Sequence, residues 1–166
     1  MELCLVRHAI AVDRRTPGYE DDSLRPLTSR GRDRMRVAAQ GLRSFFTPEA
    51  ILTSPLVRAK QTADILSTVY HLPPARPLDA LANGDHQALL AELVEIGGSA
   101  LLCVGHEPHI SALLSYLLTA NEQSLSAPFK KGGAALLQCG DDTSAGAWAL
   151  DWMATPALLR AAAAKA

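Results

Sequence analysis

Short apolar runs alternate along the chain with longer segments that have the apolar spacing of helices. The runs at residues 2–7, 50–54 and 100–104 are typical of buried strands. Strands that alternate with helices form right-handed crossovers and a mainly parallel sheet. The sequence therefore predicts an α/β fold, a three-layer sandwich with helices on both faces of a central sheet.

Capping residues, prolines and glycines mark the ends of the predicted helices. These helices run from Thr28 to about Phe46, from Ser54-Pro55 to Tyr70, over residues 85–97, and from Pro108 to about Leu118. Serine before proline is typical of a helix start, so Ser54 is interpreted as a cap rather than as a reactant. His71 and His86 flank turns, and we expect both side chains in solvent.

From Gly132 onward the apolar pattern changes to that of strands. Residues 133–139 and 147–153 predict two strands, and the Gly/Asp/Ser turn between them makes a late antiparallel hairpin. We expect a single domain over residues 1–155, which is long enough to bury a core, and a helical tail over residues 156–166.

Charge and hydropathy exclude several classes of partner. The formal net charge is −1, so the chain lacks the general basic field of a nucleic-acid-binding protein, and any anion site has to be local. No apolar run approaches the length of a membrane span, and no basic-then-apolar leader opens the chain. We therefore expect a cytoplasmic protein with no membrane and no nucleic-acid partner.

Cationic and imidazole side chains follow each of the three predicted parallel strands. Arg7 and His8 follow the first, Arg58 lies in the first helical turn after the second, and His106 follows the third. Because such strands end at one edge of the sheet, these side chains are predicted to share a pocket. Guanidiniums bind phosphate oxygens, helix N-termini attract anions, and histidines supply a nucleophile and a donor. An isolated Arg-His pair would fit a solvated strand edge equally well, but three strand ends together predict a phosphate site.

The sequence predicts no metal and no cofactor at this site. His8, His106 and His109 form a histidine cluster, yet the neighbouring arginines would repel a cation. No glycine-rich nucleotide loop is present. The three cysteines, an odd number, lie among apolar neighbours and are interpreted as small buried hydrophobes: Cys4, Cys103 and Cys139.

Four motifs together resemble the histidine phosphatase superfamily, whose signature is Arg-His-Gly after the first strand and whose fold is phosphoglycerate mutase-like. The motifs are LVRHA at residues 5–9, LTSRG at 27–31, TSPLVRAKQTA at 53–63 and VGHEPHI at 104–110. Within the superfamily, the short length and LRPLTSRG are most similar to bacterial phosphohistidine phosphatases of the SixA type. Ala9 stands in place of the signature glycine. The short stretch from Arg58 to His106 has no room for the lid of larger relatives.

The resemblance implies a phosphatase that hydrolyses phosphohistidine on a protein, such as a histidine-transfer signalling domain. It implies that His8 attacks phosphorus and carries a covalent phosphoryl group, which water then removes. Arg7 and Arg58 would hold the phosphoryl oxygens, and His106 would donate to the charge that gathers there. Arg25 is a candidate substrate or partner contact at the rim, or equally a surface arginine that packs on its loop.

Two other functions stay open at this point. One is a small-molecule phosphomonoesterase or mutase with the same fold, and the other is a non-catalytic module that binds phosphoproteins. Asp79, Asp85 and Glu107 are candidate proton donors for the first. The Lys130-Lys131 pair would attract an acidic partner or is simply solvated.

Overall fold

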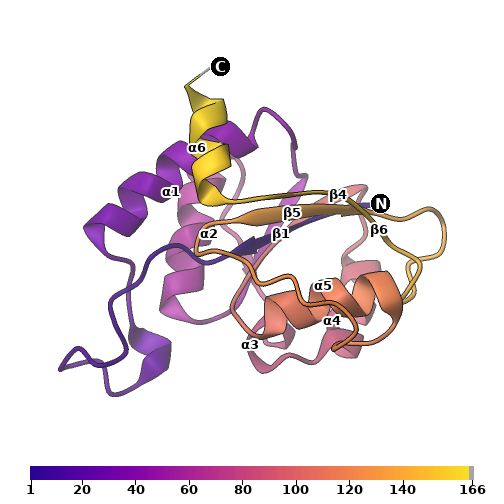
Figure 1. Cartoon of the computed structure of the whole chain (residues 1–166), viewed down its shortest axis with the longest axis horizontal. Helices are drawn as coiled ribbons and strands as arrows, with labels where there is room; N and C mark the ends of the chain where they lie inside the picture. The colour runs from indigo at the N-terminus through magenta and orange to yellow at the C-terminus, as the bar shows by residue number, and fades with distance from the viewer. Residues whose placement is uncertain (165–166) are drawn as a thin grey trace.

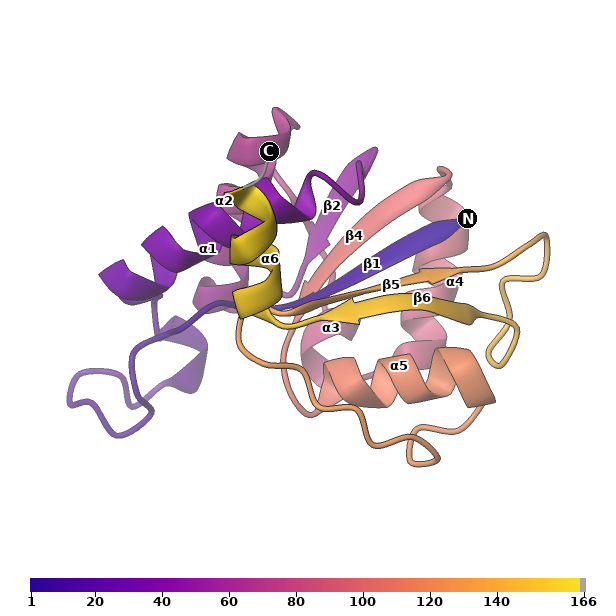
Figure 2. The same ribbon diagram turned by 45° about the horizontal axis from the view of Figure 1, so that its top comes forward.

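A six-stranded sheet forms the centre of the molecule, with the strand order β3-β2-β4-β1-β5-β6 (Figures 1 and 2). The structure is a computed structural model and describes residues 1–164. The strands are β1 (Glu2–Arg7), β2 (Ala50–Thr53), β3 (Arg76–Pro77), β4 (Ala100–Gly105), β5 (Ala134–Gln138) and β6 (Ala149–Ala154). β1, β2, β3 and β4 pair in parallel, and β5 pairs antiparallel with both β1 and β6.

Helices cover both faces of this sheet. The helical segments are a 3-10 turn (Asp22–Leu24), α1 (Ser29–Leu42), α2 (Val57–Tyr70), α3 (Ala80–Asn83), α4 (His86–Ile96), α5 (His109–Thr119) and α6 (Pro156–Ala163). Helices α1, α2 and α6 lie on one face and α3, α4 and α5 on the other (Figure 2). The predicted three-layer α/β fold with a late antiparallel hairpin is therefore confirmed.

The central strands are apolar throughout because each face of the sheet has its own core. In β1, Cys4 and Val6 pack under the α1 and α2 face, whereas Leu3 and Leu5 pack under the α5 face. Strands buried on both faces need apolar residues at every position, which explains the unbroken runs in the sequence. Cys4 and Cys103 are buried as predicted, Cys139 is half-buried, and all three are free thiols.

Helix boundaries differ from the sequence expectation in two places. Thr28 caps α1 as predicted, since its side chain accepts the Gly31 N–H at 2.9 Å, but the helix ends at Leu42 rather than Phe46. Tighter turns follow it, which bring Phe46 back into the core. Helix α2 begins at Val57, so Ser54 is not its cap. The buried Ser54 hydroxyl instead contacts a histidine ring of the candidate site.

His86 is buried rather than solvated, which corrects the sequence expectation. Its ring nitrogens contact the carboxylate of Glu122 at 2.8 Å and the carbonyl oxygen of His109 at 3.0 Å. Both partners come from segments distant in sequence, so local pattern could not place them.

His71 is exposed, as expected. Strand β3 and helix α3 were not predicted, because elements this short have no periodicity.

The C-terminal helix lies along α1 on the outside of the sheet (Figure 1). Its contact is close, since a Cβ added at Gly41 of α1 would lie 1.8 Å from the carbonyl oxygen of Leu159 in α6. The division into a domain at 1–155 and a tail at 156–166 stays a prediction, and residues 165–166 lie outside the described residues. In the part of the chain that the structure describes, no helix has the length and apolarity to cross a membrane.

We expect Gly41→Ala to lower the free energy of unfolding by about 1–3 kcal/mol, because the added methyl forces α1 and α6 apart. This is the net change, because the cost of the close contact is larger than the ~1 kcal/mol by which alanine is more favourable than glycine inside a helix. Urea unfolding of both variants measures the change. Gly140→Ala is the control, because a Cβ there meets nothing within 4 Å. Equal midpoints for the two variants would contradict the close packing of α6 on α1.

Candidate functional site

The ends of the parallel strands bring Arg7, His8, Arg58 and His106 together. The His8 and His106 rings lie with their centroids 5.3 Å apart. The positive charges of Arg58 and Arg7 both act on His8. Backbone hydrogen bonds fix the end of β1: the His8 N–H donates to the Gly105 carbonyl at 3.0 Å. The structure thus gathers the four residues as the sequence predicted, and their chemical roles stay predictions.

His8 is held in one orientation by the residue that follows it. Its Nδ1 lies 2.7 Å from the carbonyl oxygen of Ala9. A carbonyl only accepts hydrogen bonds, so Nδ1 carries the proton and Nε2 keeps its lone pair. Burial, together with the charges of His106, Arg58 and Arg7, lowers the pKa of His8 to about 3, although the Ala9 hydrogen bond opposes this. His8 is therefore a neutral imidazole at neutral pH, and its Nε2 has no hydrogen-bond partner within residues 1–164.

Thr62 of α2 links Ala9 to the helix that carries Arg58. The Ala9 N–H donates to Thr62 Oγ1 at 3.0 Å, and that hydroxyl donates to the Arg58 carbonyl oxygen at 2.7 Å. Thr62 is fully buried. The position of His8 relative to the first turn of α2 is thus set by one buried hydroxyl group.

His106 contacts Ser54 through one ring nitrogen and presents the other without a partner. Its Nε2 lies 2.6 Å from Ser54 Oγ, which also accepts the Leu56 N–H at 3.3 Å. When the Ser54 hydroxyl donates to Nε2, the one proton of the neutral ring lies on Nδ1. Nδ1 is buried and has no hydrogen-bond partner among the described residues. Burial and the charges of Arg58 and His109 lower the pKa of His106 to about 3, which Asp22 partly opposes.

The two arginines are anchored by backbone carbonyls and carboxylates. Arg7 Nη1 donates to the carbonyl oxygen of Phe129 at 2.5 Å. Arg58 is buried and donates from Nη1 to the Asp22 carbonyl at 2.7 Å. Burial lowers the pKa of each guanidinium, which the charge of Glu107 opposes for Arg7 and that of Asp22 for Arg58. The Nε atoms of Arg7 and Arg58 are buried without hydrogen-bond partners among the described residues.

Asp22 is the residue of this site that sequence reasoning missed. Its carboxylate pairs with Arg58 at 2.9 Å, Arg25 at 2.8 Å and Arg14 at 3.1 Å. Burial alone would raise the pKa of Asp22, but the hydrogen bond from Arg25 and the charges of the three arginines outweigh it and lower the pKa. The only sequence signal was an acidic run before Arg25, which does not single out one of its members.

Arg25 is buried rather than a surface arginine. It is 5% exposed, and its Nη1 donates to the Val12 carbonyl oxygen at 2.5 Å. It is linked to Arg58 through the shared Asp22 carboxylate. Arg25 therefore adds positive charge to the site and supports its loop, and direct contact with substrate stays a prediction.

The carboxylates considered as proton donors are engaged in structural hydrogen bonds or lie at helix ends. Glu107 accepts the Phe129 N–H at 2.7 Å and the hydroxyl of Ser111. Asp85 caps α4 by accepting the Ala88 N–H at 2.9 Å, and Asp79 precedes α3 with an exposed side chain. Within residues 1–164, no three His, Cys, Asp or Glu side chains gather as metal ligands.

The family model of the histidine phosphatase superfamily (branch 1) matches residues 3–92, which include Arg7, His8 and Arg58. The chain belongs to this superfamily. Over 115 residues the chain is 43% identical to an uncharacterized protein of Picosynechococcus sp. The match covers 66% of this chain and 68% of that protein. It is 26% identical over 169 residues to the phosphohistidine phosphatase SixA of Escherichia coli, covering 98% of both chains.

Solved structures share this histidine phosphatase fold. The protein histidine phosphatase SixA in complex with tungstate superposes with a TM-score of 0.77 at 25% identity, covering 96% of this chain and 99% of that one. A mycobacterial glucosyl-3-phosphoglycerate phosphatase superposes with a TM-score of 0.67 at 22% identity, covering 93% and 99%. The family and fold expected from the motifs are therefore confirmed, and enzymes with different substrates share the fold.

The two buried histidines predict a loss of stability in mild acid. Unfolded histidines take up protons below a pKa of about 6.5, whereas His8 and His106 stay neutral in the folded state to about pH 3. The unfolded state then binds more protons than the folded state. The free energy of unfolding therefore falls as the pH drops from about 6.5 toward 3, by up to ~1.4 kcal/mol per pH unit for each histidine. Urea unfolding at pH 7 and pH 5 measures this, and His8→Gln is expected to reduce the difference. An undiminished difference in His8→Gln would contradict the neutral buried state of His8.

We expect Asp22→Asn to bind inorganic phosphate about tenfold more tightly, because the carboxylate repels a dianion and neutralises Arg58. Isothermal titration measures the phosphate Kd. Asp33→Asn is the matched control, since Asp33 pairs with Arg36 on an exposed turn of α1. Weaker phosphate binding in Asp22→Asn would mean that orienting Arg58 matters more than the charge of the carboxylate.

Proposed function

We propose that this protein hydrolyses phosphohistidine on a protein substrate, such as a histidine-transfer domain, through a covalent phospho-His8 intermediate. The observation that carries the proposal is the arrangement of His8. Its Nδ1 is bound to the Ala9 carbonyl, and its free Nε2 belongs to a neutral ring that the charges of two guanidiniums reach. A neutral, fixed imidazole is a nucleophile at physiological pH without a further base.

The reaction has two displacements at phosphorus. First, the Nε2 lone pair of His8 forms a bond to phosphorus while the bond from phosphorus to the substrate ring breaks; the other nitrogen of that ring carries a proton taken from solvent, so the ring leaves as neutral imidazole. Water then attacks the phosphoryl group on His8, releasing inorganic phosphate and restoring Nε2. Arg7 and Arg58 donate to the phosphoryl oxygens, and the buried Nδ1–H of His106 donates to the charge that develops on them.

The leaving group favours phosphohistidine over alkyl phosphates. An alkoxide has a conjugate acid with a pKa near that of water, about 15.7, so its departure needs a proton donor. Asp22 is held ionised by its arginines, Glu107 is engaged by the Phe129 N–H and the Ser111 hydroxyl, and Asp79 and Asp85 lie at helix starts. An imidazole ring protonates with a pKa of about 6.5 and leaves as a neutral group. The full-length similarity to SixA supports the same substrate class.

The test is kcat/KM for a phosphorylated histidine-transfer domain against a panel of phosphorylated metabolites. We expect the protein substrate to be preferred and His8→Gln to remove turnover, with phosphate trapped on His8 of the wild type in rapid-quench samples. Arg7→Ala and Arg58→Ala should each lose about 10²–10³ in rate, typical of one lost donor. His71→Gln, at an exposed position, is the control. A metabolite preferred by tenfold or more would favour a small-molecule phosphatase instead.

A further inference from the structure

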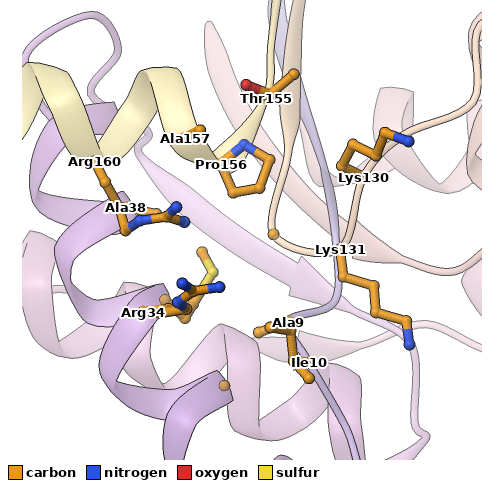
Figure 3. A pocket seen from close by; sticks show the side chains of 13 residues that line it. Ala9, Ile10, Arg34, Ala38, Lys130, Lys131, Thr155, Pro156, Ala157 and Arg160 are labelled. Atoms are coloured by element: carbon orange, nitrogen blue, oxygen red, sulfur yellow. The ribbon is translucent and has the colours of Figure 1, made fainter.

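A pocket of about 380 Å³ lies beside the candidate phosphate site, between α1, α6 and the loop before β5 (Figure 3). None of the four predicted catalytic residues lines it. It adjoins them through Ala9, the residue after His8, and through Gly132, whose N–H donates to the carbonyls of Arg7 and His8 at 3.0 and 3.1 Å. A molecule in this pocket therefore lies next to the backbone that positions the nucleophile.

The pocket is strongly basic, and we call it the basic pocket. Arg34 and Arg160 extend from the helical side toward the pocket, and Lys130 and Lys131 lie at the opposite edge with their ammonium groups directed outward (Figure 3). No acidic residue lines the pocket, and none of these four cations forms an ion pair within residues 1–164. The chain as a whole has a net charge of −1, so this positive charge is local to the pocket. This local excess of positive charge attracts a ligand with several negative charges.

The wall between the cations is apolar. Ile10, Met35, Ala38 and Pro156 line it, and Ala157 in the first turn of α6 lies at its edge. A free phosphate ion would pair with the cations but would leave this wall in water. A peptide segment that carries both carboxylates and apolar side chains satisfies both parts of the lining.

We propose that the basic pocket docks an acidic, partly apolar segment of the phosphorylated protein substrate, next to the phosphohistidine that enters the His8 site. This inference rests on the proposed function, because it assigns a second contact to the same substrate. Phe129, which immediately precedes Lys130, accepts a hydrogen bond from Arg7. The pocket and the phosphate site thus share one loop, and one protein surface reaches both.

The first experiment measures binding without catalysis. An unphosphorylated synthetic peptide rich in glutamate and leucine is titrated into the ¹⁵N-labelled protein, and the amide signals of Ala9, Arg34 and Gly132 are followed. The double variant Arg34→Gln/Lys131→Gln should bind about tenfold more weakly, which corresponds to ~1.4 kcal/mol. The matched control is Lys60→Gln/Arg76→Gln, which removes two exposed positive charges elsewhere and should bind as the wild type does.

A second variant guards against a folding defect. Ala157→Glu places a carboxylate at the edge of the pocket, and an acidic residue in the first turn of α6 is favourable for the helix. We expect this variant to keep its unfolding midpoint and to lose peptide binding. Peptide binding that is unchanged in both pocket variants, or a peptide that leaves the pocket amides unshifted, would overturn the proposal.

The third measurement separates docking from chemistry. For a phosphorylated histidine-transfer domain, Arg34→Gln/Lys131→Gln should raise KM about tenfold, whereas hydrolysis of free phosphohistidine should not change. If the wild type binds the peptide in the pocket but hydrolyses no phosphoprotein, the proposed function fails and the docking site stands. If inorganic phosphate shifts the Arg34 amide, which lies away from the His8 site, and displaces the peptide, the pocket is a small-anion site and the docking proposal is wrong.

Discussion

The hydrogen bonds around the carboxyl end of β1 hold the candidate site in place. The Arg7 N–H donates to the Gly133 carbonyl and the His8 N–H to the Gly105 carbonyl, so strands on both sides hold the same two residues. Gly132 completes the arrangement from the loop before β5. Because β1 is covered on both faces, His8 lies directly after a buried strand rather than on a free loop.

The electrostatics of the site follow from burial. Imidazoles that are taken out of water beside guanidiniums lose their protons, so the positive charge of the site comes from its arginines. Buried arginines in turn need anions, and in this structure Asp22 supplies one for Arg58. Arg58 therefore has a carboxylate partner before any phosphate arrives, whereas Arg7 forms no ion pair within residues 1–164.

Much of this arrangement could be predicted from the sequence. Unbroken apolar runs give the strands, and a parallel sheet forces Arg7, His8, Arg58 and His106 to one edge, so their meeting depends on topology alone. Ser54 and His86 show the limit of such reasoning. Serine before proline has the local signature of a cap, but its hydroxyl is used by His106, fifty-two residues away in sequence. The buried ring of His86 is hydrogen-bonded to Glu122, which lies thirty-six residues away in sequence. The role of Asp22 depends on a loop that folds back onto α2, where the Asp22 carbonyl accepts a hydrogen bond from Arg58. Contacts of this kind carry no local pattern.

The threonine bridge from Ala9 to α2 has a consequence for how the site responds to a ligand. Since Thr62 ties the residue after His8 to the carbonyl of Arg58, the end of β1 and the first turn of α2 are joined by two buried hydrogen bonds. If His8 and Arg58 act as proposed, a substrate meets two groups whose relative positions are set by folding, and less of its binding energy is needed to arrange them.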